Sequence, residues 1–227
     1  MVIVAGPSGG GKSSIFSIHN IEGVTPFSND DYCAALNAQR LGQSQPVYQG
    51  ITPELRAQGG AVMHQFIEDH IAARRPFAFE TTLRELTLEQ ARRATANGFR
   101  VEMVFVAAGP VEEHIRRVQI RADQGGHSAS ETSLREIYAR GMRLLPVAFE
   151  ANRKRVIETL DVFHNPDASA TASALPHPIL IVKMVRGYLD LSRGLAENPP
   201  DWFRTAVRGS DFEIEKLRAR SRDDFER

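Results

Sequence analysis

The sequence contains very little cysteine and no long apolar run. Cys33 is the single cysteine among 227 residues, so an internal disulfide is excluded and a reducing compartment is favoured. No apolar segment approaches the ~20 residues that a membrane-spanning helix needs. The first apolar run stops at Gly6, too early for a signal peptide. We therefore expect a cytoplasmic protein without a membrane partner.

The sequence also lacks an excess of either charge. Lys+Arg and Asp+Glu both number 28, so the formal net charge at pH 7 is zero. Because this balance gives no overall attraction to a polyanion, a nucleic-acid partner is not expected and any basic site has to be local. Hydrophobic residues make up 42% of the chain, an ordinary proportion for a globular protein. The length fits one domain, 1–227.

Short apolar runs alternate with amphipathic segments along the chain. Strands are expected at 2–5, 23–27, 77–80, 100–108, 161–165 and 178–185, and helices after Lys12 and at 52–76, 87–98, 111–124 and 133–160. Thr52 before Pro53 predicts a helix start, and Pro146 predicts a kink or a split in the last helix. The alternation predicts an α/β fold of three layers, a mostly parallel sheet with helices on both faces.

The last third of the chain has a different character. Residues 166–177 are mostly small and predict a loop. Residues from about 188 to 227 predict a helical tail, which could bind a partner or fray but which we expect to dock on the sheet. Trp202 and Phe203 are expected to pack this tail rather than to stack on a base.

The segment GPSGGGKS, residues 6–13, satisfies the pattern G-x-x-x-x-G-K-[ST]. A strand is expected before it and a helix after it, which is the context of a phosphate-binding loop (P-loop) rather than of a flexible turn. Glycines let backbone amides face a phosphate. Lys12 would reach the β- and γ-phosphates of ATP, and the Ser13 hydroxyl would bind Mg²⁺. The predicted nucleotide-binding residues are Gly6, Ser8, Gly9, Gly10, Gly11, Lys12, Ser13 and Ser14.

Signatures of other P-loop proteins are missing. The sequence has no LSGGQ-like segment of ABC-type ATPases, no four-hydrophobic strand ending in Asp-Glu, and no Asn-Lys-x-Asp motif of GTPases. What remains is the pattern of a small kinase, in which a carboxylate activates an acceptor hydroxyl and arginines cover the transferred phosphoryl group. We therefore expect a P-loop NTPase fold of the small-kinase type.

Carboxylates follow two of the expected strands. Asp30 and Asp31 come directly after the second strand, where one could accept the proton of an acceptor hydroxyl while Asn29 or Asp30 caps the next helix. Glu80 ends the third strand. It could pair with Arg84, but ligands bind at this edge of open α/β sheets, which favours a role in the site.

Arginines gather in a lid-like helical region at about 110–145. Arg117 and Arg121 lie four residues apart, before Gly125 and Gly126. They could form a solvated surface, but two neighbouring like charges beside a glycine hinge are better explained by an anion between them. His127, after the hinge, is expected to be structural or solvated.

The chain resembles the zeta-toxin-like P-loop kinases, often described as predicted ABC-type ATPases, from Gly6 to about Asn165. The motifs that carry the resemblance are GPSGGGKSS, NDDYCA, FAFETTL and RVQIRADQGGHSASE with LREIYAR. Departures are the three consecutive glycines of the loop, Ser130 in place of a usual proline, and Glu136-Ile137 within an arginine-rich run. These departures leave open which arginine of the lid is catalytic.

The resemblance implies roles for individual residues. Asp31 would be the general base, Lys12 the phosphate-binding lysine and Ser13 a ligand of Mg²⁺. Glu80 and Thr82, with Arg84 beside them, would bind the acceptor. Arg117 and Arg121, together with Arg135 and Arg140, would stabilise the charge of the transferred group.

The sequence therefore predicts an ATP- and Mg²⁺-dependent phosphotransferase acting on a hydroxyl of a small metabolite. The resemblance suggests UDP-N-acetylglucosamine as the acceptor. Residues 36–56 are expected to line its pocket, with Arg40, Tyr48 and Arg56 as candidates. Two alternatives stay open: a 5′-hydroxyl nucleic-acid kinase, and a non-catalytic, nucleotide-gated module held by an antitoxin protein.

Overall fold

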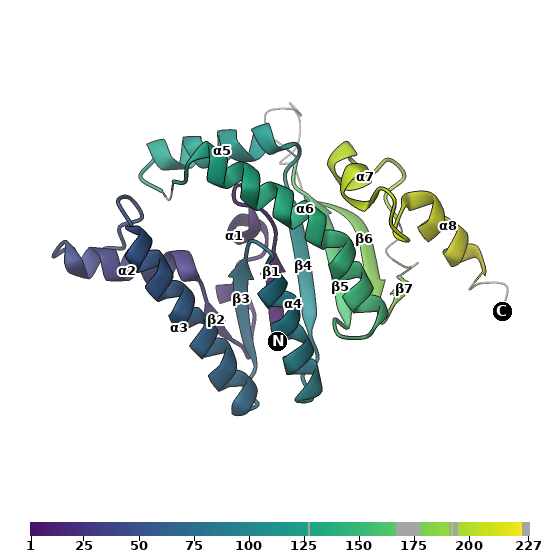
Figure 1. Ribbon diagram of the computed structural model, residues 1–227, viewed down its shortest axis with the longest axis horizontal. Coiled ribbons are helices and arrows are strands. Elements are labelled where there is room, and N and C mark those ends of the chain that lie inside the picture. The colour runs from purple at the N-terminus through teal and green to yellow at the C-terminus, as the bar shows by residue number, and fades with distance from the viewer. Residues whose placement is uncertain (127, 167–177, 191, 193–194, 224–227) are drawn as a thin grey trace.

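The computed structural model describes residues 1–126, 128–166, 178–190, 192 and 195–223 (Figure 1). His127 and nearly all of the expected loop at 166–177 lie outside these residues. No helix in the described part of the chain has the length and apolar character needed to cross a membrane.

The strands of the described residues form one sheet of seven. Its order is β2-β3-β1-β4-β5-β6-β7. The bounds are β1 Val2–Ala5, β2 Thr25–Phe27, β3 Phe77–Thr81, β4 Glu102–Ala107, β5 Thr159–His164, β6 Ile179–Val185 and β7 Tyr188–Leu189. Strands β1 to β5 pair in parallel, and β6 and β7 add two antiparallel pairs at one edge. The expected mostly parallel sheet is confirmed.

Helices cover the two faces of the sheet unequally. They are α1 Lys12–Ile15, the 3₁₀ turn η1 Ile18–Asn20, α2 Asn29–Arg40, α3 Pro53–Ala72, α4 Glu85–Ala96, α5 Val111–Asp123, α6 Glu131–Arg153, α7 Asp201–Val207 and α8 Ile214–Asp223. Figure 1 shows α3, α4 and α6 in front of the sheet. On the other face, η1 packs through Ile18 on Val4 and Ala78.

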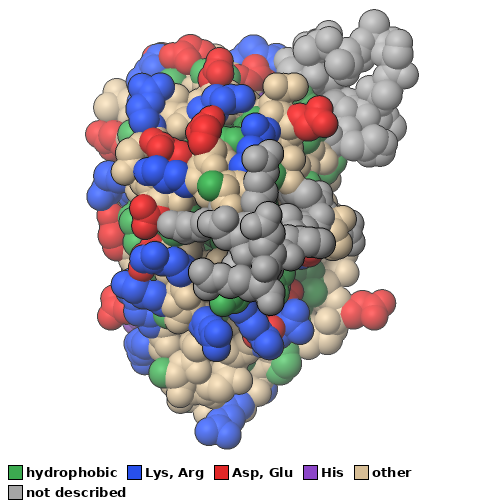
Figure 2. Space-filling model, turned by 90° about the vertical axis from the view of Figure 1, so that its right-hand side faces the viewer, with side chains coloured by type: hydrophobic (Ala, Val, Ile, Leu, Met, Phe, Trp, Pro, Cys, Tyr) green, Lys and Arg blue, Asp and Glu red, His purple; other side chains and the backbone are tan. Residues whose placement is uncertain are grey.

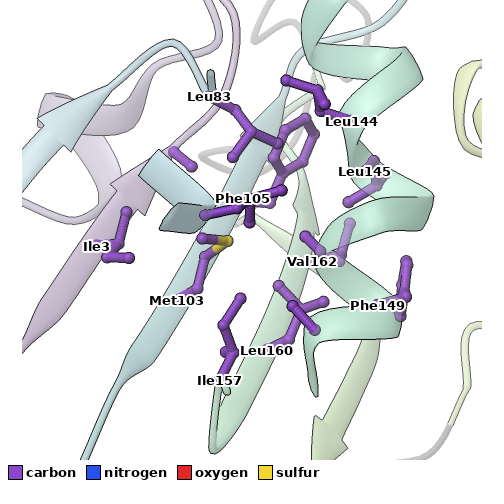
Figure 3. Close-up of a cluster of buried hydrophobic side chains, with 14 of the residues drawn as sticks. Ile3, Leu83, Met103, Phe105, Leu144, Leu145, Phe149, Ile157, Leu160 and Val162 are labelled. Carbon is purple, nitrogen blue, oxygen red and sulfur yellow. The ribbon is translucent and has the colours of Figure 1, made fainter. Parts of the chain in front are cut away.

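The main core follows from the alternation of side chains along the strands. Phe105, Leu160 and Val162 point to the face that α6 covers with Leu145 and Phe149, and all five are fully buried (Figure 3). Each such side chain stabilises the fold by roughly 1.5–3 kcal/mol relative to an exposed position. The residues between them along each strand point to the opposite face of the sheet, so each strand contributes side chains to both faces.

Helix α6 corrects the expectations of a split at Pro146 and of a helix reaching residue 160, whereas a kink at this proline stays a prediction. It runs through Pro146 without interruption and ends at Arg153. Leu144, Leu145, Ala148 and Phe149 are buried on both sides of the proline, so packing holds the helix together across it. In the last turn of the helix, the Asn152 side chain donates to the carbonyl oxygens of Ile157 and Glu158 at 2.9 and 3.1 Å.

The C-terminal segment packs against the rest of the molecule, as expected. Trp202, Phe203 and Phe212 are buried in the main core, and the rings of Phe149 and Phe212 lie 5.0 Å apart. The Trp202 indole donates to His164 Nδ1 at 3.3 Å. Figure 2 shows basic and acidic side chains interspersed on the face beside this segment, in line with the zero net charge.

Candidate active site

Several of the residues that the sequence singles out meet at the carboxyl ends of β1, β2 and β3. A cavity of about 490 Å³ lies at this edge of the sheet. One side of it is lined by the P-loop residues Ser8, Gly9, Gly11, Lys12, Ser13 and Ser14. The other side is lined by residues of α2, α3, α4 and the end of β3, with Arg121 of α5. Open α/β sheets bind ligands at this edge.

The P-loop is pressed closely against β4. Gly6, directly after β1, has a φ of +138°, and a Cβ there would lie 2.0 Å from the carbonyl oxygen of Val106. A Cβ on Gly10 would lie 2.8 Å from the same oxygen. The glycines are therefore required both by the turn and by the close approach of the two backbones.

Lys12 lies half-buried next to the loop. Its ammonium group donates to the carbonyl oxygens of Gly6 and Pro7 at 2.9 and 3.2 Å. Burial lowers the pKa of Lys12, whereas the carboxylates of Glu80 and Asp30 act to raise it. The lysine thus lies between the loop and two acidic groups, where a bound polyphosphate would add further negative charge.

Glu80 lines the cavity beside the loop, near the end of β3. Its Oε2 accepts a hydrogen bond of 3.0 Å from Ser13. Burial raises the pKa of Glu80, against the opposite influence of Lys12 and of the Ser13 hydrogen bond. Thr82 and Arg84, which follow in the chain, line the same cavity. The structure therefore brings Glu80, Thr82 and Arg84 together, with Ser13 as a hydrogen-bond partner of the glutamate.

Asp30 and Asp31 have different surroundings. Among the described residues, Asp30 lines the cavity and Asp31 does not. Asp31 accepts hydrogen bonds from Tyr48 Oη at 2.8 Å and from His19 Nε2 at 3.3 Å. Burial and the bond to Asp31 raise the pKa of Tyr48 to about 12, so the phenol stays protonated and holds this carboxylate.

The cap of α2 differs from the expectation that Asn29 or Asp30 would supply it. Ser28 is the N-cap, and its hydroxyl accepts a hydrogen bond from the Asp31 amide at 3.2 Å. Both acidic residues fall in the first turn of the helix, where its dipole favours negative charge. Capping therefore leaves the Asp30 carboxylate available to the cavity.

The arginines of α5 and α6 divide into separate groups. Arg121 lines the cavity, and its charge lowers the pKa of Lys12. Arg117 donates through Nε to Glu113 at 2.5 Å and through Nη2 to the Asn165 carbonyl at 3.0 Å. Arg135 pairs with Glu131 and Glu112 at the surface, and Arg140 lies half-buried on α6. The structure thus brings Arg121 to the cavity and ties Arg117 to its own helix and to the end of β5.

The wall opposite the P-loop includes residues that the sequence did not single out. Met63 and His64 come from α3, and Gln90 comes from α4. The Gln90 amide donates to His64 Nδ1 at 3.4 Å. Arg56, one of three candidates from residues 36–56, also lines the cavity, whereas Tyr48 bonds to Asp31 and Arg40 to Asn37. These side chains carry no motif and are brought together by the packing of α3 beside α4.

The oxygen atoms of Ser13 and Glu80 fit the preference of Mg²⁺. This ion is usually bound by one or two protein oxygens together with phosphates and water. The described residues contain no group of three or more His, Cys, Asp or Glu placed to hold a metal without such help. A magnesium site here would therefore depend on a bound phosphate.

Comparisons with known proteins agree with this fold. A family model described as an AAA domain matches residues 1–143. No curated protein matches the sequence. A solved structure from the PezAT chromosomal toxin-antitoxin system of Streptococcus pneumoniae has a TM-score of 0.53 at 13% identity, covering 100% of this chain and 86% of that one.

A second similar structure is the AvrRxo1-ORF1:-ORF2 complex with ATP. Its TM-score is 0.63 at 12% identity, over 85% of this chain and 60% of that chain. The same complex with sulphate ions gives a TM-score of 0.62 at 11% identity. At these identities the likeness establishes a shared fold, in line with the α/β fold of P-loop NTPases.

Proposed function

This chain belongs to the AAA domain family, and on that premise we propose that it is a kinase that transfers the γ-phosphate of ATP to a hydroxyl group of a small metabolite. One observation carries the proposal. One cavity is lined by the P-loop, by the acidic residues Asp30 and Glu80, and by Arg121. Phosphoryl transfer needs this combination of a phosphate cradle, a proton acceptor and a cation.

The donor side would bind ATP through backbone amides and Lys12. The Lys12 ammonium would exchange its bonds to Gly6 and Pro7 for phosphate oxygens, which are stronger acceptors because they are charged. Ser13 and Glu80 would hold Mg²⁺ together with the phosphates. The ion, when bound, offsets the negative charge of the β- and γ-phosphates.

The acceptor hydroxyl would lose its proton to one of the two neighbouring aspartates. Its oxygen attacks the γ-phosphorus, the bond from that phosphorus to the bridging oxygen of ADP breaks, and the carboxylate takes the proton. The resemblance to zeta-toxin-like kinases assigns this role to Asp31. We favour Asp30 because it lines the cavity, whereas both oxygens of Asp31 already accept hydrogen bonds.

Arg121 would stabilise the charge of the transferred phosphoryl group. It is the arginine of α5 that lines the cavity on the side of Lys12. Arg117 would act through its bond to Asn165 rather than on the phosphate. One fixed cation beside the γ-phosphate is worth several kcal/mol of barrier in such sites, roughly 10²–10³ in rate.

The acceptor side supports a polar substrate that carries an anionic group. Arg56 and Arg84 line it together with His64 and Gln90. A nucleotide sugar has both the hydroxyls and the phosphates that such a wall can bind. UDP-N-acetylglucosamine is therefore the first acceptor to test.

A transfer screen with γ-labelled ATP tests the proposal. The full chain is incubated with UDP-sugars, with nucleosides or with 5′-hydroxyl oligonucleotides. The Lys12→Ala variant is assayed with the same acceptors as the control. We expect label on a small metabolite with wild type and a loss of at least 100-fold with the variant. Label on oligonucleotides alone would favour the nucleic-acid kinase. Tight ATP binding without transfer to any acceptor would favour a non-catalytic module.

We also propose that a partner protein restrains this activity. The support is one similar structure, which comes from a toxin-antitoxin system. Expression of the chain alone in a bacterial host should then slow growth, and Lys12→Ala should restore it. Equal growth of cells with wild type and variant at equal protein level contradicts this role.

A further inference from the structure

Two carbonyl groups of the P-loop point away from the cavity and onto side chains from distant parts of the chain. The Ser8 oxygen accepts a hydrogen bond of 2.9 Å from His114 Nδ1 on α5. The Gly10 oxygen accepts one of 3.0 Å from Asn165 Nδ2, directly after β5. The sequence distances, 106 and 155 residues, exclude a local turn as the cause.

The direction of these carbonyls fixes the direction of the next amides. In a planar trans peptide, the C=O of one residue and the N–H of the next point to opposite sides. With the Ser8 and Gly10 carbonyls held outside, the N–H groups of Gly9 and Gly11 face the cavity. Gly9 and Gly11 indeed line it, with φ of +78° and +87°. The intervening Gly10 amide donates to the Pro7 carbonyl at 3.1 Å and closes the turn.

His114 is held in one protonation state by two backbone groups. The Ala108 amide donates to His114 Nε2 at 3.0 Å, so this nitrogen carries a lone pair and Nδ1 carries the proton given to Ser8. The side chain is buried, and its ring meets that of Tyr138 edge-on at 5.1 Å. The imidazole is therefore a fixed link between the end of β4 and the loop.

Asn165 is fixed in the same manner. Its backbone N–H donates to the Ala107 carbonyl at 2.9 Å, and its backbone carbonyl accepts from Arg117 Nη2 at 3.0 Å. Glu113 in turn accepts from Arg117. A Cβ on Gly11 would lie 2.1 Å from Asn165 Nδ2, and one on Gly9 would lie 2.4 Å from the His114 carbonyl oxygen. The consecutive glycines let both supports approach the loop.

We propose that His114 and Asn165 are positioning residues that orient the Gly9 and Gly11 amides toward the phosphates of the bound nucleotide. The inference rests on the proposed function only in requiring that the loop binds ATP. The two side chains touch the loop from outside the cavity and act on the phosphate through backbone orientation.

Binding measurements on the full chain test this proposal. Affinities for ATP and for tripolyphosphate are measured by calorimetry with wild type, His114→Leu, His114→Asn and Asn165→Ala. We expect His114→Leu and Asn165→Ala to weaken both ligands about tenfold, the effect of one lost hydrogen bond. His114→Asn places an N–H near the position of Nδ1 and should recover most of the affinity. The ligand-induced shifts of the Gly9 and Gly11 amide resonances should shrink in the two weak variants.

The matched control is His70→Leu. His70 is also a buried histidine with Nδ1 against a backbone carbonyl, that of Phe66 at 2.8 Å, but it lies in α3 away from the loop. The His70→Leu variant should bind ATP and tripolyphosphate as tightly as wild type. Affinities of His114→Leu and Asn165→Ala within twofold of wild type, or an equal loss in His70→Leu, overturn the proposal. Normal binding without transfer by the wild type would contradict the kinase assignment and leave this inference standing.

Discussion

The donor and acceptor halves of the cavity are built in different ways. The donor half comes from one continuous segment, residues 6–14, whose backbone is held by β4, His114 and Asn165. The acceptor half comes from side chains on three helices and a strand end, among them Asp30, Arg56, His64 and Gln90. A backbone site tolerates little change because it depends on close approach, whereas a side-chain site can vary residue by residue.

The difference fits the chemistry of the two ligands that the proposed function requires. All P-loop enzymes bind the same polyphosphate, so its cradle can be rigid. Acceptors differ between enzymes, and side chains on separate helices can be exchanged without moving the sheet. The comparison predicts that substitutions on the donor side change ATP binding and that those on the acceptor side change transfer alone.

Replacing the two aspartates gives the largest expected effect. Asp30→Asn removes the carboxylate that lines the cavity and should lower kcat by 10²–10⁴ with ATP affinity nearly unchanged, because a general base contributes about that much. Asp31→Asn should lower kcat less, since this residue is bonded to Tyr48 and His19. The measurement is steady-state transfer to the acceptor found in the screen.

Each outcome of that pair has a definite meaning. A larger loss in Asp31→Asn returns the role of base to Asp31, as the sequence pattern implies. A loss of ATP affinity in Asp30→Asn shows that the carboxylate belongs to the donor half, and it breaks the division between the halves. A circular dichroism spectrum of each variant checks that α2 is intact.

Two glycine substitutions compare the halves directly. A Cβ on Gly10 would lie 2.8 Å from the Val106 carbonyl oxygen, so Gly10→Ala has to displace the loop and should weaken ATP about tenfold or more. Gly60 lies in α3 on the acceptor side, and a Cβ there meets nothing within 4 Å. Gly60→Ala should leave ATP affinity unchanged and raise the free energy of unfolding by roughly 0.5–1 kcal/mol. Calorimetry and denaturant titration measure the two effects, and equal ATP affinities of the two variants would contradict the comparison.

The same difference explains which parts of the site the sequence could predict. The P-loop is recognisable because its residues are contiguous and each has a fixed role, and Glu80 and Thr82 because they end an apolar strand. His64, Gln90 and Met63 could not be found, because the packing of α3 against α4 is what brings them to the cavity. Asp30 and Asp31 were both found, but only the first turn of α2 decides which carboxylate faces inward.

The fold shows a similar limit. The positions of β1 to β6 and the mostly parallel pairing followed from apolar runs and their alternation with helices, whereas the order of the strands and β7 did not. The uninterrupted α6 did not, because burial of Leu145 and Phe149 beside Pro146 outweighs the local cost of the proline. The fixed tautomer of His114 likewise depends on Ala108 and Ser8, which only the folded chain brings to its ring.

His114, which supports the donor half, should make the free energy of unfolding depend on pH. Burial lowers the pKa of His114 to about 4, below the ordinary value of about 6.5. Between these values the unfolded chain binds the proton more readily, so stability is full above pH 6.5 and falls as the pH drops toward 4. His114→Asn should remove a loss on the order of 1–2 kcal/mol between pH 7 and pH 5. Denaturant titrations at both pH values measure this loss, with His70→Leu as control. If His114→Asn loses as much unfolding free energy between pH 7 and pH 5 as wild type does, His114 is not the cause.

The smallest expected effect concerns Glu80, which lies between the two halves. Burial raises its pKa, so its contribution to stability is full below the unfolded value and is lost as the pH rises through the folded one. At pH 7 the ionised side chain therefore destabilises the fold, and Glu80→Gln should raise the melting temperature by a few degrees while transfer falls. A group kept for packing would give the opposite pair of results, a lower melting temperature with transfer retained. Thermal unfolding over a series of pH values below 7 separates them, because the gain should shrink as the pH falls and Glu80 binds a proton. A gain that stays equal over the whole series would mean that charge is not the cause.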